Sequence, residues 1–302
     1  MKKLKDKNCL LTGGATGIGR CLAIGLAKEG MNLFIADIDV EGLEKVKKEI
    51  EGFGVKVFTG RVDISRYEDF ENLAKQVYSE LGDIDLLINN AGIAGGGLVE
   101  ALELEEWKHV LDINLWGIIH SLKVFLPRMV ERGSGHIVNT GSGAGVVGIP
   151  YHIHYIASKF AVAGISEALY SELSHKGIKV SVICPTYLKT NIIDRTPIKV
   201  VEKFIESEDP EDVKKKAAEF KRLFWEKYMA NSMSVEQAAR RYIKGIKKDR
   251  LYIFDSRRPR IGMFLKAVFE RLYKKVLRSE CNKDIKMIEE VLSELGIKYD
   301  NI

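Results

Sequence analysis

The sequence predicts an α/β fold in which a doubly wound parallel sheet carries helices on both faces. Short apolar segments alternate with longer segments of helical periodicity from residue 9 to about residue 256, and this alternation is typical of repeated strand–helix–strand units. The first strand leads directly into a glycine-rich turn. Apolar residues make up 46% and charged residues 29% of the 302 residues, which excludes disorder and low complexity for most of the chain.

Each strand is predicted from a short apolar run, and each helix from apolar positions that recur every three or four residues. The predicted strands are Cys9–Leu11, Asn32–Ala36, Val55–Val62, Ile84–Ile88, His136–Asn139, Lys179–Ile183 and Arg250–Phe254. The predicted helices are Gly17–Lys28, Val40–Glu51, Tyr67–Leu81, Glu103–Val110, Asp112–Val130, Tyr155–His175 and Ser234–Lys247, the last with Ser234 as its N-cap.

The pattern predicts a core domain over residues 1–256 and a helical C-terminal extension over residues 257–302. Within the extension, residues 257–278 hold eight lysines and arginines and a single glutamate, a net charge of +7, whereas the whole chain carries +5. Residues 283–295 predict an acidic amphipathic helix. Its apolar face consists of Ile285, Ile288, Val291, Leu292 and Leu295.

Cysteine spacing and hydropathy predict the cellular context. Cys9, Cys21, Cys184 and Cys281 form neither a C-x-x-C pair nor a zinc pattern, so we expect free thiols in a reducing compartment and no metal site. The apolar run Cys9–Leu11 is too short for a signal-peptide core. No run approaches 18 uninterrupted apolar residues. We therefore expect a cytoplasmic protein without a membrane span.

The turn after the first strand predicts a dinucleotide site. In Thr12–Gly19, the residues Gly13, Thr16, Gly17 and Gly19 lie between the first strand and the first helix. Glycines let the backbone approach a pyrophosphate closely, and the helix N-terminus offers it free N–H groups and a partial positive charge. Such a turn also occurs for structural reasons alone, but its place at the first strand–helix junction favours the functional interpretation.

Asp37, at the end of the second strand, predicts the choice of dinucleotide. A carboxylate there can accept hydrogen bonds from both adenosine ribose hydroxyls and would repel a 2′-phosphate. No cation follows it directly, because residues 38–40 are Ile, Asp and Val. This favours NAD(H) over NADP(H); the alternative is a solvated carboxylate without a role.

Four motifs together resemble the short-chain dehydrogenase/reductase family, in its single-domain branch, over roughly residues 5–255. They are Gly13-x-x-x-Gly17-x-Gly19, Asn89-Asn90-Ala91-Gly92, Ser142 and Tyr155-x-x-x-Lys159. The resemblance implies a Rossmann-type, seven-stranded parallel sheet with helices on both sides, and an NAD(P)-dependent oxidoreductase that acts on alcohols or ketones.

The residues themselves support this chemistry. Tyr155 and Lys159 are four apart, so a helix places them on one face. A nearby ammonium favours the phenolate, so we expect Tyr155 to take the proton from a substrate hydroxyl while hydride passes to NAD⁺. The Ser142 hydroxyl can hold the substrate oxygen. By resemblance, Asn114 orders a water in a proton relay through Lys159, Lys159 also bonds the nicotinamide ribose, and Tyr155 is a further cofactor contact.

Further cofactor contacts are implied by the resemblance alone. Asp63 would bond the adenine amino group, and Ile18 would pass beneath the phosphates. Pro185 and Thr190 would hold the carboxamide, although Thr186 replaces the family's glycine between them and would disfavour a positive φ there. The residues expected along the adenosine are Asn90, Ala91 and Gly92.

The substrate pocket is expected under a lid formed by residues 191–232. This segment contains Phe204, Phe220, Phe224, Trp225 and Tyr228, which favours a bulky apolar alcohol or ketone. The flexible loop Ala94–Gly97 should face the same side of the sheet. His152 and His154 flank this site and line the pocket or lie in a solvated loop. Two histidines without a third ligand do not make a metal site.

The basic part of the extension allows several partners. A single helical stripe over residues 261–278 carries Ile261, Phe264, Leu265, Val268, Phe269, Leu272 and Val276. Packing on the enzyme body or on a partner subunit is favoured over an anionic membrane surface, and no motif accompanies the charge to indicate nucleic acid. We expect a homodimer or homotetramer. An extension over the last strand favours the dimer, built on helices Asp112–Val130 and Tyr155–His175.

The sequence thus predicts an NAD(H)-dependent oxidoreductase that interconverts a secondary alcohol and a ketone, with Asn114, Ser142, Tyr155 and Lys159 as its catalytic set. An NADPH-dependent carbonyl or 3-oxoacyl reductase is the alternative, and Asp37 disfavours it. A non-catalytic dinucleotide sensor, scaffold or membrane-surface protein is disfavoured because both Tyr155 and Lys159 are present.

Overall fold

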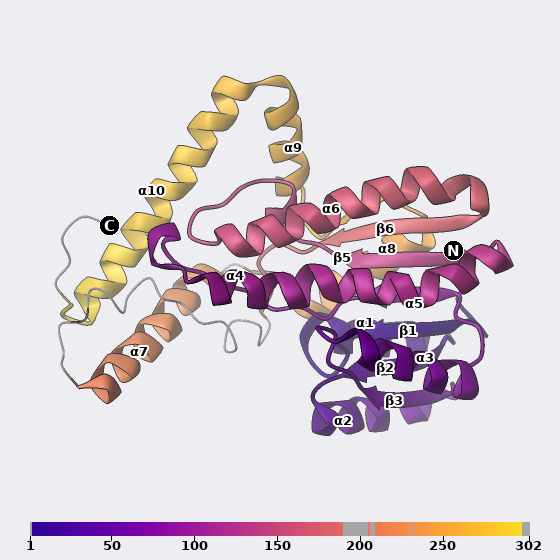
Figure 1. Cartoon of the computed structure of the whole chain (residues 1–302). Helices are drawn as coiled ribbons and strands as arrows, with labels where there is room; N and C mark the ends of the chain where they lie inside the picture. The colour runs from indigo at the N-terminus through magenta and orange to yellow at the C-terminus, as the bar shows by residue number, and fades with distance from the viewer. Residues whose placement is uncertain (1, 190–204, 206–208, 231, 298–302) are drawn as a thin grey trace.

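Seven parallel strands form one sheet in the order β3-β2-β1-β4-β5-β6-β7 (Figure 1). The computed structural model describes all residues except 1, 190–204, 206–208, 231 and 298–302. The strand order reverses between β1 and β4, which is where ligands bind in sheets of this kind. The strands are β1 Asn8–Thr12, β2 Asn32–Asp37, β3 Val57–Arg61, β4 Leu86–Asn89, β5 Gly135–Thr140, β6 Ile178–Cys184 and β7 Tyr252–Phe254.

Helices cover both faces of the sheet because its strands are apolar on both sides. Leu11 packs with α1, α2 and α8, whereas the adjacent Leu10 packs with α3, α5 and α6. The predicted three-layer architecture is therefore confirmed. The helices are α1 Gly17–Lys28, α2 Val40–Ile50, α3 Tyr67–Glu80, α4 Leu104–Leu111, α5 Gly117–Arg132, α6 Ile153–Leu173, α7 Pro210–Met229, α8 Val235–Lys247, α9 Arg258–Val268 and α10 Glu270–Glu294.

One helical run replaces the two helices predicted between β4 and β5. A π-helical turn, Asp112–Trp116, joins α4 to α5 without a break, so the predicted separation at residue 111 is wrong. No glycine or proline stands at that position to end the first helix. The run, Leu104–Arg132, is long and apolar enough to cross a bilayer by length and composition. Phe125 and Met129 of this run are buried in the main core.

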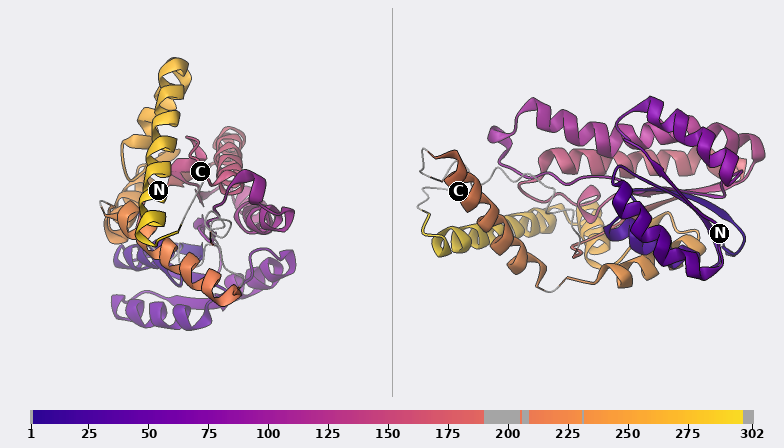
Figure 2. Two further views of the ribbon diagram at one scale, coloured as in Figure 1. Left: turned by 90° about the vertical axis from the view of Figure 1, so that its left-hand side faces the viewer. Right: turned by 90° about the horizontal axis from the view of Figure 1, so that it is seen from below.

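The C-terminal extension forms a helical hairpin that projects from the body (Figures 1 and 2). The predicted single stripe over residues 261–278 is wrong, because the backbone leaves the helical region at Phe269, with φ −128° and ψ 64°. The hairpin therefore turns between α9 and α10. The predicted apolar face of residues 283–295 is confirmed, since Ile288, Val291 and Leu292 are buried in a small core that they share with α7.

Candidate active site

The glycines between β1 and α1 are required by close backbone contacts. Gly13 and Gly17 have positive φ values of 69° and 55°. A Cβ atom on Gly19 would lie 1.9 Å from the Gly13 carbonyl oxygen. Gly14, which the motif does not include, is equally constrained, since a Cβ there would lie 2.1 Å from the side chain of Ile35. Side chains would clash or be strained at these positions, so the backbone of the turn is left accessible to a pyrophosphate.

Side chains from neighbouring strands hold this cradle in place. The Asn90 amide donates to the carbonyl oxygens of Thr12 and Gly13, at 3.1 and 2.9 Å. The Thr12 hydroxyl accepts from the backbone N–H groups of Asn90 and Ala91, at 3.1 and 3.3 Å. The Asn90 side chain is therefore occupied in fixing the loop. Thr12 has a role that the sequence analysis missed, and its place just before Gly13 was the available signal.

The start of α1 is suited to an anion. Its N-cap, Thr16, makes no side-chain capping bond, and its first turn holds no acidic residue. The free N–H groups of this turn and the glycine cradle therefore fit a dinucleotide pyrophosphate, which would carry two negative charges. Ile18 is partly buried against the core below.

Two carboxylates lie at the strand ends beside the cradle. Asp37 accepts from the backbone N–H of Ala15 at 3.0 Å and from that of Asp39 at 3.1 Å. Asp63 accepts from both the backbone and the hydroxyl of Ser65, at 3.0 and 2.7 Å. Asp37 therefore fastens the glycine loop to β2, and its position is set by the same bonds.

The fold brings Gly92, Asn114 and Lys159 together. A Cβ atom on Gly92 would lie 2.9 Å from Asn114 Oδ1 and 3.4 Å from Lys159 Nζ. Asn114 is buried in the π-helical turn, where its amide exchanges two hydrogen bonds of 2.9 Å with the backbone of Ile93. The Lys159 ammonium donates to the Thr140 carbonyl at 3.0 Å, and burial lowers its pKa to about 8.

Tyr155 lies beside Lys159 and Ser142 at the start of α6. Lys159 Nζ is 5.7 Å from the centroid of the Tyr155 ring. Burial raises the pKa of Tyr155, and a hydrogen bond with Ser142 lowers it by less. The predicted lowering of this pKa by Lys159 is not found in the protein alone, where burial has the largest effect and raises the pKa. A positive charge brought in by a bound cofactor would act in the predicted direction.

Ser158 connects two members of the catalytic set. Its hydroxyl donates to the Tyr155 carbonyl at 2.6 Å and accepts from Asn114 Nδ2 at 3.1 Å. This link between α6 and the π-helical turn joins residues 44 apart in the sequence. A serine within a helix carries no signal of such a contact, so the sequence analysis missed it.

The comparisons with known proteins agree with this geometry. The family model described as short chain dehydrogenase matches residues 7–199. The chain belongs to the short-chain dehydrogenase family. It is therefore an NAD(P)-dependent oxidoreductase that acts on alcohol or ketone groups, and the fold and enzyme class predicted from the sequence are confirmed.

Relatives within the family differ in substrate. Cyclohexanol dehydrogenase of Acinetobacter sp. (strain SE19) is 35% identical over 192 residues, which cover 63% of this chain and 76% of that one. The 3-oxoacyl-[acyl-carrier-protein] reductase of Thermotoga maritima is 32% identical over 200 residues, 66% and 81% of the two chains. A crystal structure of a Burkholderia phymatum family member in complex with NAD has a TM-score of 0.77 and 28% identity, and covers 90% of this chain and 96% of that one.

This short-chain dehydrogenase holds the segment after β6 through a buried carboxylate. Asp255 accepts from the backbone N–H and the hydroxyl of Thr186, at 2.9 and 2.8 Å, and from the Tyr242 hydroxyl at 2.7 Å. Pro185 accepts from the backbone N–H of Gly143 at 2.7 Å, which ties this segment to the loop of Ser142. Thr190 lies outside the described residues.

Thr186 does not strain this segment. Among the described residues, positive φ values outside glycine occur at Asp6, Tyr151 and Asp249, so Thr186 has an ordinary backbone conformation. The strained positive φ that a threonine in place of glycine could have had is not found at Thr186. The threonine hydroxyl also donates a hydrogen bond to Asp255 that glycine could not make.

Replacing Asp255 by alanine should lower the free energy of unfolding by about 3 kcal/mol, because one buried donor on Tyr242 and two partly buried donors on Thr186 lose their acceptor. Replacing Thr186 by valine removes one of these bonds and should cost about 1 kcal/mol. Urea denaturation of both variants and the parent checks the difference. Equal losses in the two variants would contradict a shared network centred on Asp255.

The loop Ala94–Gly97 packs on the two histidines before Tyr155. His152 Nδ1 lies 2.7 Å from the Gly95 carbonyl oxygen. A Cβ atom on Gly95 would lie 2.2 Å from His154 Nε2, and one on Gly96 would lie 3.1 Å from the His152 ring. The glycines therefore allow direct contact with the histidines, and the described residues contain no cluster of three or more metal-binding side chains.

The extension reaches the loop that precedes Tyr155. The hydroxyl groups of Tyr187 and Tyr228 are 2.5 Å apart, and Tyr187 is close enough to Tyr155 to raise its pKa. Asp284 of α10 lies close to Tyr187 and Tyr228. Burial raises the pKa of its carboxyl to about 6. Tyr151 shares a hydrogen bond with Cys281. The sequence analysis gave α10 no place near the site.

Proposed function

We propose that this short-chain dehydrogenase uses NAD(H) to interconvert a secondary alcohol and a ketone that carry a bulky apolar skeleton. The observation that supports the cofactor most directly is Asp37. Its carboxylate stands at the end of β2, fixed by two backbone N–H groups, where a ribose would lie above the glycine cradle. The side chains of Ile38 and Val40 beside it are 52% and 50% exposed and offer no cation to a 2′-phosphate.

The residues around Tyr155 perform the acid–base step. Bound dinucleotide supplies the hydride acceptor for oxidation or the hydride donor for reduction. The Tyr155 phenolate takes the proton from the substrate alcohol during oxidation, and the Tyr155 hydroxyl gives a proton to the ketone oxygen during reduction, while the Ser142 hydroxyl holds the same oxygen. The Lys159 ammonium stabilises the phenolate, because a pKa of about 8 leaves it charged at neutral pH.

The proposed substrate class rests on two aromatic side chains near Tyr155 and on one relative. Tyr187 and Tyr228 meet edge to face, with ring centroids 4.5 Å apart, next to the catalytic tyrosine. Phe220 of the lid is less informative than its sequence suggested, because it is buried against α10. The relative that acts on cyclohexanol supports a cyclic secondary alcohol.

An NADPH-dependent 3-oxoacyl reductase is the second candidate, and one residue favours it. Arg61, at the end of β3, is paired with Asp37 in the strand register and is exposed. Its guanidinium is therefore a candidate to bind a 2′-phosphate. The relative from Thermotoga maritima is named for this reaction.

Thermal shift with NAD⁺, NADH, NADP⁺ and NADPH separates the two candidates. We expect NAD⁺ and NADH to raise Tm, since a ligand at 100 times its Kd adds about 2.7 kcal/mol to stability, and we expect smaller shifts with NADP⁺ and NADPH. Oxidation rates with cyclohexanol should then exceed those with a polyol such as xylitol. A larger shift with NADPH would contradict the proposed cofactor, and a preference for the polyol would contradict the proposed substrate class.

A further inference from the structure

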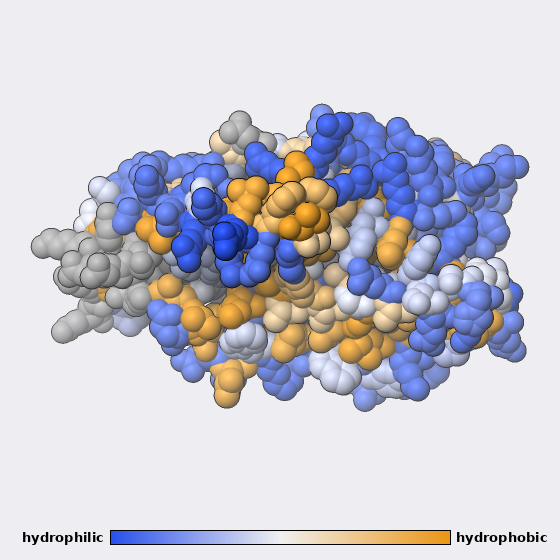
Figure 3. Space-filling view, turned by 90° about the horizontal axis from the view of Figure 1, so that it is seen from above, coloured by the Kyte–Doolittle hydropathy of each residue, from blue (hydrophilic) through white to orange (hydrophobic). Residues whose placement is uncertain are grey.

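The end of the projecting hairpin exposes a group of large apolar side chains. Five such side chains are 48–58% exposed and lie together on two consecutive helices and the turn between them, whereas the other large apolar side chains that the structure exposes are spread over other elements. Phe264 and Phe269 contact each other across the turn, with ring centroids 6.0 Å apart. Figure 3 looks down on this end of the molecule and shows an apolar patch bordered by hydrophilic residues. We call Ile261, Phe264, Val268, Phe269 and Leu272 the apolar tip.

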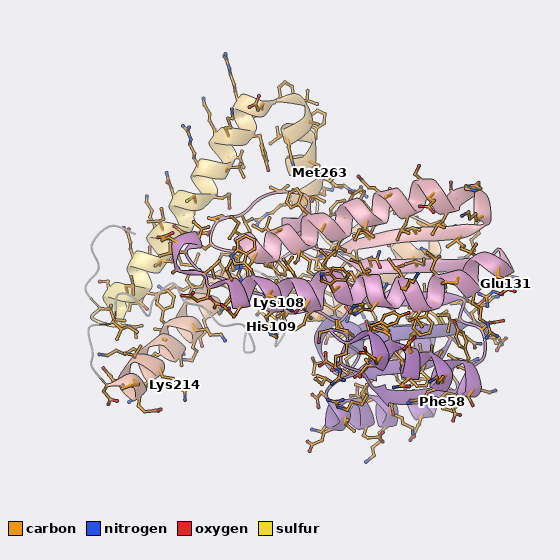
Figure 4. The ribbon with its side chains drawn as sticks, viewed as in Figure 1. Phe58, Lys108, His109, Glu131, Lys214 and Met263 are labelled. Atoms are coloured by element: carbon orange, nitrogen blue, oxygen red, sulfur yellow. The ribbon has the colours of Figure 1, made fainter. Side chains whose placement is uncertain are left out.

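The apolar tip is not needed to hold the hairpin on the body. The opposite side of α9 does this. Gly262 approaches Val147 so closely that a Cβ atom would lie 2.5 Å from it, and Met263, at the base of α9 in Figure 4, packs into the main core. The Lys266 ammonium lies 4.6 Å from the centroid of the Phe160 ring. α9 therefore has two apolar sides, of which one is satisfied within the chain and one faces outward.

Cations flank the apolar tip along the hairpin and continue along α10. In this part of the chain Glu270 is paired with Lys274 at 2.5 Å, and Glu280 with Lys283 at 2.6 Å. A hollow on α10 is lined by Lys275, Arg278, Ser279, Asn282, Lys283 and Lys286. The exposed cations of the hairpin are Arg257, Arg258, Arg260, Lys266, Arg271, Lys274, Lys275 and Arg278. Arg271, Lys274, Lys275 and Arg278 follow the turn on α10, whereas Arg260 and Lys266 lie over the rings of Phe254 and Phe160 on the body side of α9.

We propose that the hairpin docks this enzyme on an anionic membrane surface, with the apolar tip in the boundary of the acyl chains and the surrounding cations on the lipid phosphates. Apolar side chains bordered by lysine and arginine are what such a surface binds. Each cation near the surface adds attraction that salt screens. Apolar insertion alone or charge attraction alone gives weak attachment, and the hairpin supplies both.

A second copy of the chain fits the apolar tip less well than a membrane does. Residues 257–278 carry a net charge of +7, so two hairpins meeting tip to tip would bring like charges together as their apolar groups met. A lipid surface of opposite charge has no such conflict. The charge around the tip therefore decides in favour of the membrane.

Vesicle flotation of the full chain tests the proposal, with vesicles of phosphatidylcholine alone and of phosphatidylcholine with 30% phosphatidylglycerol. We expect binding to the anionic vesicles only, and at least a tenfold weaker partition in 0.5 M salt. Phe264→Ser with Phe269→Ser should lower the partition coefficient at least tenfold, and Arg271→Glu with Lys275→Glu should do the same.

Matched variants elsewhere on the surface provide the controls. Leu104→Ser removes an apolar side chain that is 80% exposed on α4, and Lys45→Glu with Lys48→Glu makes the same charge change on α2. Neither should alter flotation, and every variant should keep the Tm of the parent. The proposal is overturned if the parent does not float, if both sets of variants weaken it equally, or if the phenylalanine variant only converts a dimer to a monomer in light scattering.

Discussion

Replacing Tyr155 by phenylalanine should reduce kcat for alcohol oxidation by about 10³-fold, within the range that a positioned acid–base group contributes. The phenylalanine keeps the ring beside Lys159 but has no phenolate oxygen to take the substrate proton. The cradle at Gly13, the carboxylate of Asp37 and the ammonium of Lys159 are untouched, so the Kd for the dinucleotide should stay within about twofold, because only one hydroxyl group near it is removed. Initial rates and fluorescence titration measure the two quantities separately.

Tyr170→Phe is the matched control for this substitution. Tyr170 lies on the same helix, α6, but is 45% exposed on its outer side, so the loss of its hydroxyl should leave kcat unchanged. If Tyr155→Phe retained more than about a tenth of the parent activity, proton transfer through this residue could not supply the usual share of the rate enhancement. The role assigned to Tyr155 would then be wrong.

The sheet was predictable because its signals are local. Each strand is a short apolar run between turn residues, and the helices that cover it repeat their apolar positions within a few turns. The tight turn at Gly13 and the face shared by Tyr155 and Lys159 are local in the same sense. The structure therefore places these residues where the spacing predicted.

Contacts between distant segments could not be predicted in this way. Asp255 binds Thr186 across 69 residues, and Ser158 meets Asn114 only because the π-helical turn carries the asparagine to α6. The break at Phe269 was also missed, since neither glycine nor proline marks it in the sequence. In each case the partner of a residue is defined by packing that the one-dimensional pattern does not contain.

The aromatic residues of α7 show how composition can mislead. Phe220 and Phe224 stack with ring centroids 5.7 Å apart, and Phe220 is buried with Val291 and Leu292 of α10. An aromatic lid predicted a large apolar pocket, but part of that apolar surface holds two helices together. Tyr187 and Tyr228 are left as the aromatic residues whose hydroxyl groups meet near Tyr155.

Replacing Asp37 by asparagine should shift the preference for NAD⁺ over NADP⁺ by about a hundredfold, measured as the ratio of the two kcat/KM values. The amide keeps the shape of the side chain and one acceptor oxygen, so the glycine loop remains attached to β2. Loss of the charge weakens hydrogen bonds to the ribose hydroxyls of NAD⁺, by about 1–2 kcal/mol. It also removes repulsion of the 2′-phosphate, so that the two effects add in the ratio.

Asp39→Ser controls for the change of net charge beside the cofactor. Asp39 caps α2 by accepting from the backbone N–H of Gly42 at 3.0 Å, and serine can make the same bond, so the ratio should stay near that of the parent. A shift as large as that of Asp37→Asn would mean that long-range charge, and not a contact with the ribose, sets the preference. If neither variant changed the ratio of kcat/KM values, a group other than Asp37 would set the cofactor preference. Arg61, which is paired with Asp37 in the strand register, would be tested first.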